Sequence, residues 1–341
     1  MNVTISLEEK KPSGVLRVIT CVSRKRKRKG ISMANRQEIE ETYNFMDEIF
    51  PLSFGENADL TCAMYNGDFS KTLQQAQKDK HYYILKGINF KAGARVLDIG
   101  CGFGPVLKVV KERGGHGIGL TLSAKQAERC KQSGLEAYVK DWKDVSVDTF
   151  GMFDGIVSVG AFEHFCSVEE YLAGKQDQIY DDFFRLCHEL LPEGGRLFLQ
   201  TMMWGKNAPE YAKISLTAEK GSNEYIIAVL GKFFPGSWLP FGEEHILRTA
   251  APYFELVSDN NGRLDYIETM EQWGKVWNFT FSNFKFPNFS FPRVLAVSKV
   301  VPRYLVDKEF RSRMELLRNG YDKECFRREL LDHQRMVFQK R

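Results

Sequence analysis

The sequence lacks several features that would place it quickly in a class of protein. Its seven cysteines include no CxxC pair and its six histidines show no metal-ligand spacing, so we expect no structural zinc site and no metal. No apolar run approaches the ~20 residues of a membrane-spanning helix. Glu8, Glu9, Lys10 and Lys11 interrupt the N-terminus before a secretion signal can build. Scattered cysteines fit a reducing compartment, which predicts a cytoplasmic protein.

Charge of one sign is also scarce. A net charge of +4 over 341 residues is too mild to imply a nucleic-acid partner, and we expect none. The exception is an unbroken basic run that begins at Arg24 and ends at Lys29, inside a segment (1–33) that we expect to be a flexible tail. Such a run favours peripheral contact with an anionic membrane. A solvated tail without a partner is the alternative, and both stay open.

What the sequence does contain is an alternation of apolar strands and helices between residues 93 and 203. We predict strands at 95–99, 117–121, 137–140, 155–159 and 196–201, a helix capped by Ser123, and a helix over 180–191. This pattern predicts an α/β fold with a doubly wound, mostly parallel, Rossmann-like sheet. Ligands of such sheets gather at the carboxyl ends of the strands.

The rest of the chain divides around this core. We expect an N-terminal helical lid segment over 34–92, with its longer helix at about 72–87. An aromatic-rich cap is expected over 204–309, and a C-terminal helix and final strand over 310–341, the strand at 335–340. An aromatic cap suits an apolar substrate, although packing within the cap accounts for many of these side chains.

A glycine loop follows the first predicted strand. Gly100, Gly102 and Gly104 alternate with other residues directly before a helix. A dinucleotide-binding loop has the spacing GxGxxG, whose third glycine would fall on Pro105 here. The GxGxG spacing after Asp98 instead predicts the S-adenosylmethionine (SAM) loop of a class I methyltransferase, with residues 93–203 as the SAM-binding core. The alternative is an ordinary strand-to-helix turn.

Three stretches resemble the cyclopropane fatty-acid synthase and mycolic-acid methyltransferase family. They are residues 96–104, 119–126 and 158–165, and the last two are more specific than the glycine loop. Residues 61–63 are similar to a Ser-Cys-Ala segment of the family, and residues 234–236, 239–240, Tyr266 and Trp273 match in order. The resemblance runs from about Tyr43 to the C-terminus and implies a SAM-dependent methyltransferase.

The resemblance also implies which residues bind SAM. Gln126 takes the place of the acid that usually holds the ribose. From its place after the third predicted strand, Trp142 is expected to stack on the adenine; the alternative is a half-buried aromatic at the strand end. Asp98 lies too deep to act as a base and orients the loop. The predicted cofactor-binding set is Thr61, Asp98, Gly100, Gly102, Gly104, Thr121, Leu122, Gln126 and Trp142.

By the same resemblance the methyl acceptor is a cis double bond of a lipid acyl chain. The family is understood to hold a bicarbonate ion as the base that removes a proton and closes a cyclopropane ring. Its positions correspond to the Cys62 backbone, the Val159 carbonyl, the side chains of Glu163 and Tyr266, and a histidine on the fifth strand. Glu163 and His164 follow the fourth strand, where the acceptor should lie.

Gln200 occupies that histidine position and is the chief departure from the family. Glutamine adds no charge and cannot shuttle a proton, so methyl transfer is expected while a methyl-branched or hydroxylated product competes with ring closure. Two further departures are an insertion at about 166–178 and a segment at about 278–305. Two alternatives stay open: a methyltransferase of a small amine or polyketide-like molecule, and a non-catalytic protein that binds a membrane or partner.

Overall fold

The computed structural model describes residues 59–233, 236–277, 302–308, 310–311 and 320–341. All of them belong to one compact unit, Ile31–Arg341. Several predicted features fall outside the described residues: the basic run, the first part of the lid segment, most of the departure at 278–305, and residues 312–319 of the segment expected to hold the C-terminal helix and final strand. Within the described ranges, none of the helices combines the length and the apolar character that crossing a membrane requires.

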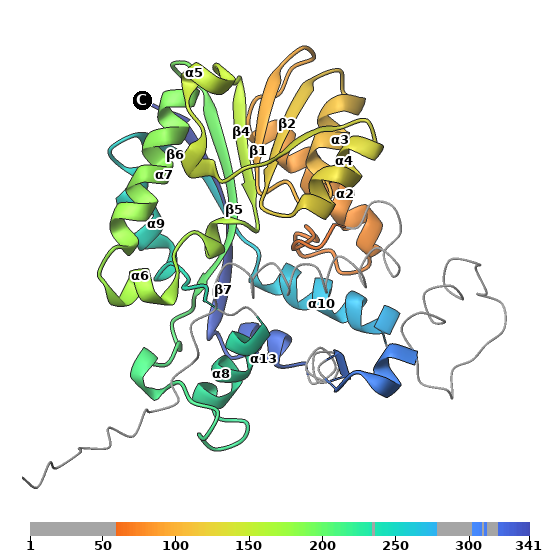
Figure 1. The fold of residues 1–341 in the computed structure, drawn as a ribbon, viewed down its shortest axis with the longest axis vertical. Helices are drawn as coiled ribbons and strands as arrows, with labels where there is room; N and C mark the ends of the chain where they lie inside the picture. The colour runs from red at the N-terminus through yellow and green to blue at the C-terminus, as the bar shows by residue number, and fades with distance from the viewer. Residues whose placement is uncertain (1–58, 234–235, 278–301, 309, 312–319) are drawn as a thin grey trace, which may run out of the picture. The chain divides into compact units, whose positions relative to one another are not determined.

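The described strands form one sheet in the order β3-β2-β1-β4-β5-β7-β6 (Figure 1). The first five strands in the chain pair in parallel, and β7 and β6 are antiparallel to their neighbours. This confirms the predicted doubly wound, mostly parallel sheet. The bounds are β1 (Arg95–Ile99), β2 (His116–Thr121), β3 (Glu136–Val139), β4 (Gly155–Val159), β5 (Arg196–Trp204), β6 (Phe254–Asn261) and β7 (Leu331–Lys340).

Successive side chains of a strand point to opposite faces of the sheet, and both faces of this sheet carry apolar side chains, so helices cover both. Val96 and Phe198 pack with α2 and α3 on one face, whereas Leu97 and Leu199 pack with α7 on the other. In Figure 1, α2, α3 and α4 lie on one side of the sheet and α7 and α9 on the other. Their bounds are α2 (Leu73–Gly87), α3 (Pro105–Glu112), α4 (Ala124–Gln132), α7 (Gln176–Leu190) and α9 (Gly242–Ala250).

Local capping explains where two of these helices begin. The Thr72 hydroxyl accepts from the Gln75 backbone, and Gln75 returns a side-chain contact, so a capping box starts α2. Ser123 caps α4 as predicted. The α7 helix begins at Gln176, four residues before the predicted start, so residues 166–178 hold the short helix α6 (Val168–Leu172) and the first residues of α7. The insertion is therefore largely helical.

Strand β6 was not predicted and lies at an edge of the sheet within the stretch assigned to the cap. Most of its residues are exposed, and its sequence ends in Ser258, Asp259, Asn260 and Asn261. An exposed edge strand shows no alternation of buried apolar side chains, so nothing in the local pattern indicates a strand. The final strand, predicted at 335–340, begins earlier, at Leu331.

Three helices gather below the carboxyl ends of the parallel strands: α8 (Asn223–Phe233), α10 (Arg263–Trp277) and α13 (Tyr321–Arg327) (Figure 1). They share an apolar cluster in which Ile226, Trp238, Met270 and Phe326 are buried. This cluster accounts for many of the aromatic side chains of the cap, and it places an apolar wall opposite the ends of the strands.

Candidate active site

A cavity of about 760 Å³ opens where the order of the strands reverses. From β1 the chain moves outward through β2 and β3 and then returns to β4 on the other side of β1, which is where doubly wound sheets bind ligands. All the predicted site residues except Gly104 line this cavity: Thr61, Cys62, Asp98, Gly100, Gly102, Thr121, Leu122, Gln126, Trp142, Val159, Glu163, His164, Gln200 and Tyr266.

The glycine loop forms one wall of the cavity. Gly100 has a φ of 88°, and a Cβ there would lie 2.3 Å from the Ala161 Cβ, so no other residue fits. Gly102 has a φ of 53°, and a Cβ there would meet no protein atom within 4 Å. Gly104 caps α3 with its backbone and lies against Leu135, so it shapes the loop without lining the cavity. The open space at Gly102 is the cradle that a cofactor needs.

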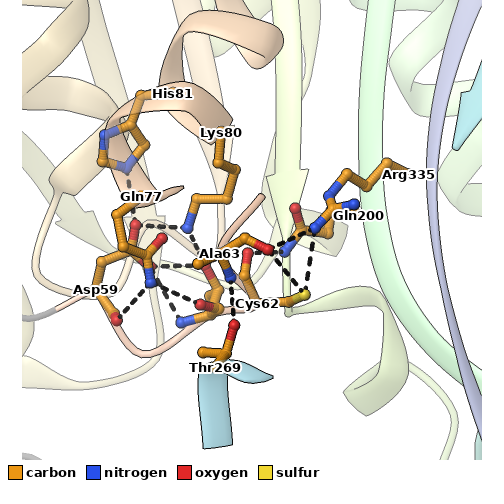
Figure 2. A network of polar contacts seen from close by, with 10 residues as sticks. Asp59, Cys62, Ala63, Gln77, Lys80, His81, Gln200, Thr269 and Arg335 are labelled. Atoms are coloured by element: carbon orange, nitrogen blue, oxygen red, sulfur yellow. Dashed lines mark hydrogen bonds and ion pairs between the residues drawn. The ribbon is translucent and has the colours of Figure 1, made fainter. Parts of the chain in front are cut away.

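Buried charged side chains lie beside this loop. Two of them, Asp59 and Lys80, were not among the predicted site residues. Lys80 is fully buried on α2, and its Nζ lies 2.5 Å from the Asp59 Oδ2 and 2.6 Å from the Thr61 Oγ1 (Figure 2). His81 Nε2 contacts the same Asp59 oxygen at 2.8 Å. Burial, reinforced by the Asp59 carboxylate, raises the pKa of Asp98 to about 7. Asp98 is 2% exposed and so lies inside the fold, and its role in orienting the loop stays a prediction.

The end of β2 carries the polar groups predicted to hold the ribose. The Thr121 hydroxyl donates to the Gln126 Oε1 at 2.7 Å, which fixes the glutamine against the strand end. Leu122 is 47% exposed and stands at the edge of the cavity. Trp142 lines the cavity and packs its ring on Phe165 and Phe183 at 5.2 and 5.6 Å between centroids. Stacking of Trp142 on the adenine stays a prediction.

Glu163 and His164 follow β4 in the short helix η2 (Phe162–His164). Glu163 is 3% exposed, and burial raises its pKa to about 7, although it accepts a hydrogen bond from the Thr201 hydroxyl at 3.0 Å. His164 Nδ1 lies 2.8 Å from the Ser237 hydroxyl, and burial lowers the pKa of the imidazole to about 4. At neutral pH, His164 is therefore uncharged and Glu163 titrates.

The segment around Cys62 is held against β5 and β7. The Gln200 Nε2 donates to the Cys62 carbonyl at 3.3 Å, and Arg335 donates to the Ala63 carbonyl at 2.7 Å (Figure 2). Arg335 also pairs with Asp265 at 3.0 Å. Burial raises the pKa of the Cys62 thiol to about 12, so the thiol is not a nucleophile at neutral pH. These contacts fix the backbone of Cys62 beside Gln200.

Tyr266 enters the cavity from α10. Its ring packs on Phe326 at 4.9 Å and on the imidazole of His333, a residue of β7, at 5.1 Å between centroids. His333, which was not among the predicted site residues, is buried and lines the same cavity. The structure thus brings together residues from five separate parts of the chain, represented by Cys62, Glu163, Gln200, Tyr266 and His333.

The strand order, the glycine cradle and the cavity at the reversal define a class I SAM-dependent methyltransferase. The chain belongs to the mycolic acid cyclopropane synthetase family, whose model matches residues 31–284. It is 32% identical to cyclopropane mycolic acid synthase 2 of Mycobacterium leprae over 215 residues, 60% of this chain and 67% of that protein. The predicted family, enzyme class and cofactor, SAM, are confirmed.

Two further proteins show the same likeness. Hydroxymycolate synthase MmaA4 of Mycobacterium tuberculosis is 29% identical over 247 residues, 70% of this chain and 77% of that protein. The crystal structure of mycolic acid cyclopropane synthase CmaA1 with SAH and CTAB has a TM-score of 0.67 and 24% identity, covering 91% of this chain and 99% of that chain. This second likeness bears on the fold.

Proposed function

We propose that this enzyme transfers the methyl group of SAM to a cis double bond of a lipid acyl chain. The observation that carries the proposal is that a single cavity includes both the glycine loop and an apolar chamber lined by residues of α8 and α10. That chamber is lined by Trp204, Ile214, Ile227, Leu230, Trp238, Met270 and Trp273. The names of the relatives, cyclopropane and hydroxymycolate synthases, support a lipid acceptor.

The residues at the strand ends fit SAM. The loop leaves open space at Gly102, where a Cβ would meet no protein atom within 4 Å, and Thr121 and Gln126 present polar groups at the next strand end. When bound, SAM supplies a methyl group on a positively charged sulfur. Gly102 would face the cofactor most closely, because a side chain there would project into the cavity.

The acceptor side of the cavity suits a reaction that develops positive charge on carbon. Trp204, Trp238 and Trp273 line it, and the electron-rich face of an aromatic ring stabilises a nearby cation. Glu163 lines the same cavity and adds a carboxylate as it ionises near pH 7. His164 is neutral and is held by Ser237, so it orients the η2 turn without adding charge.

The positions assigned to bicarbonate fit an anion poorly. None of them carries a positive charge, and the Gln200 Oε1 is a buried acceptor with no hydrogen-bond partner among the described residues. The buried cations Lys80 and Arg335 are each paired with a carboxylate, at 2.5 and 3.0 Å. No step of the proposed reaction therefore uses bicarbonate.

The proposal is tested by incubating the protein with methyl-labelled SAM and a total lipid extract and locating the label. We expect it in acyl chains, with loss of olefinic signal. Label only in a water-soluble amine would contradict the lipid acceptor, and SAM binding without any transfer would favour a non-catalytic protein. Glu163→Gln should abolish transfer while calorimetry shows unchanged SAH affinity, and Glu112→Gln, exposed on α3, is the matched control.

Peripheral membrane contact through the run from Arg24 to Lys29 is part of the same proposal. Each basic residue near an anionic surface contributes ~1 kcal/mol, and the acceptor is itself a lipid. Sedimentation with anionic and with zwitterionic vesicles tests it, with the six residues of the run replaced by glutamine as the comparison. Equal binding of the two proteins to anionic vesicles would contradict this role.

A further inference from the structure

His333 is a buried histidine whose backbone is hydrogen-bonded but whose imidazole is not, within the part of the chain that the structure describes. It is 2% exposed, and neither ring nitrogen has a hydrogen-bond partner among the described residues. A buried polar group without a partner costs about 1–3 kcal/mol, so an imidazole of this kind calls for a reason other than packing. The cavity supplies one, because His333 lines it.

The register of the sheet sets His333 next to the position that departs from the family. Gln200 pairs with Arg335, and Met202 pairs with His333, in the antiparallel ladder of β5 and β7. Alternate residues of a strand share a face, so Gln200 and His333 lie on the same face of the sheet. Both line the cavity with Glu163 and Tyr266.

Gly262 leaves room for the imidazole. A Cβ at Gly262 would lie 2.5 Å from the His333 Nδ1, so a larger residue there would displace the ring. The Nδ1 atom is fully buried, which leaves Nε2 as the nitrogen available to the cavity. An edge-to-face contact with the Tyr266 ring, 5.1 Å between centroids, restrains the imidazole.

Burial, and after it the charges around His333, keep the imidazole neutral. Burial, together with the nearby cations Arg335 and Lys80, lowers its pKa well below the ordinary value of 6.5. Each cation is matched by a carboxylate, Asp265 for Arg335 and Asp59 for Lys80. A neutral imidazole has a lone pair at neutral pH and can accept a proton.

We propose that His333 is the base that closes a cyclopropane ring in this enzyme, in place of the bicarbonate ion that the family is understood to use. The inference rests on the proposed methyl transfer to a double bond. The π electrons of the double bond form a bond to the methyl carbon as its bond to sulfur breaks, which leaves SAH and a positive charge on the neighbouring carbon. A methyl C–H bond then breaks: its proton goes to the His333 Nε2, and its electron pair forms the third side of the ring. The imidazolium releases the proton to water when the product leaves.

The test compares the wild type with His333→Gln, with the double variant Gln200→His/His333→Gln, and with His116→Asn as control. His116 is exposed at the start of β2, at the opposite end of that strand from the cavity. Each protein receives labelled SAM and vesicles of a cis-unsaturated phospholipid, and the cyclopropane fraction of the labelled acyl chains is measured. SAH binding by calorimetry shows that each variant is folded.

We expect His333→Gln to lower the cyclopropane fraction about 10²-fold, as for the loss of a positioned base, while labelled methyl-branched or hydroxylated chains still form. The double variant should recover ring closure, because it returns an imidazole to the same face, and His116→Asn should match the wild type. An unchanged cyclopropane fraction in His333→Gln would overturn the inference and leave methyl transfer standing. No labelled acyl chain with the wild type would overturn both.

Two measurements do not depend on the variant. With ¹⁵N-histidine, the NMR signal of His333 should shift when SAH and hexadecyltrimethylammonium, a cation on an acyl-like chain, are added together; no shift would overturn the inference. In carbonate-depleted buffer the wild type should keep its cyclopropane fraction. A several-fold rise in that fraction on adding bicarbonate would assign the proton to the ion instead and would also overturn it.

Discussion

Replacing Glu163 by glutamine should change how the stability of the protein depends on pH. Burial raises the pKa of Glu163 from 4.5 to about 7, so the folded protein binds this proton more tightly than the unfolded chain does. The group therefore destabilises the fold as pH rises from 4.5 to 7, and the fold is unaffected by it below that window. Glutamine removes the charge and can still accept the hydrogen bond that Thr201 now donates to Glu163 at 3.0 Å.

The size of the effect follows from the shift in pKa. A shift of this size corresponds to about 3 kcal/mol, of which about 2.5 kcal/mol falls between pH 5 and pH 8. Relative to the wild type, Glu163→Gln should thus gain about 2.5 kcal/mol in free energy of unfolding over that interval. The sign is the opposite of what removing a favourable surface carboxylate would give.

Urea denaturation of both proteins at pH 5 and pH 8 measures the difference. Glu112→Gln, at the exposed end of α3, controls for deleting one surface carboxylate. A free-energy difference between Glu163→Gln and wild type that is the same at both pH values would refute the reasoning, because it would mean that burial does not raise this pKa.

Three further predictions concern the walls of the cavity. Gly100→Ala should lower the free energy of unfolding by about 1–3 kcal/mol, because its φ is 88° and its Cβ would clash with Ala161, whereas Gly102→Ala should mainly weaken SAH binding in calorimetry. Lys80→Met should cost about 3–5 kcal/mol in urea denaturation, because it removes the cation that is paired with buried Asp59, and Lys80→Met/Asp59→Leu should recover part of that loss. Cys62, whose pKa is raised to about 12, should resist iodoacetamide at pH 8 until urea unfolds the protein, as read by mass spectrometry; rapid labelling of the native protein would contradict its burial.

The core of the fold could be predicted from the sequence because short local patterns of residues determine its strands and helix ends. The strands at 95–99 and 155–159 are apolar runs of short length, and β1 and β4 have those bounds. Ser123 and the glycine loop mark the starts of helices through interactions that span only a few residues. Strand β6 was not predicted because it is polar and exposed, and because the strand it pairs with, β7, lies about seventy residues further along the chain.

The polar part of the site could not be predicted in the same way. Arg335 donates a hydrogen bond to the Cys62 thiol, which is 273 residues away in the sequence. Lys80 is buried in an ion pair with Asp59, a contact that its own sequence neighbours do not indicate. No local sequence motif marks His333 as a site residue, because its position at the cavity depends on the pairing of β7 with β5, which places it beside Met202. Side chains of this kind are positioned by tertiary contacts, whereas the residues found from sequence were those in motifs.

One measurement tests the central claim most directly. The purified protein is incubated with SAM carrying a ¹³C methyl group and with vesicles of a phospholipid whose acyl chains each hold one cis double bond, and the extracted lipid is examined by ¹³C NMR. We predict a labelled carbon bonded at the former double bond, as the methylene of a cyclopropane ring, and no label in vesicles of the saturated lipid. Label that stays entirely in SAM, or that appears equally with the saturated lipid, would contradict the account.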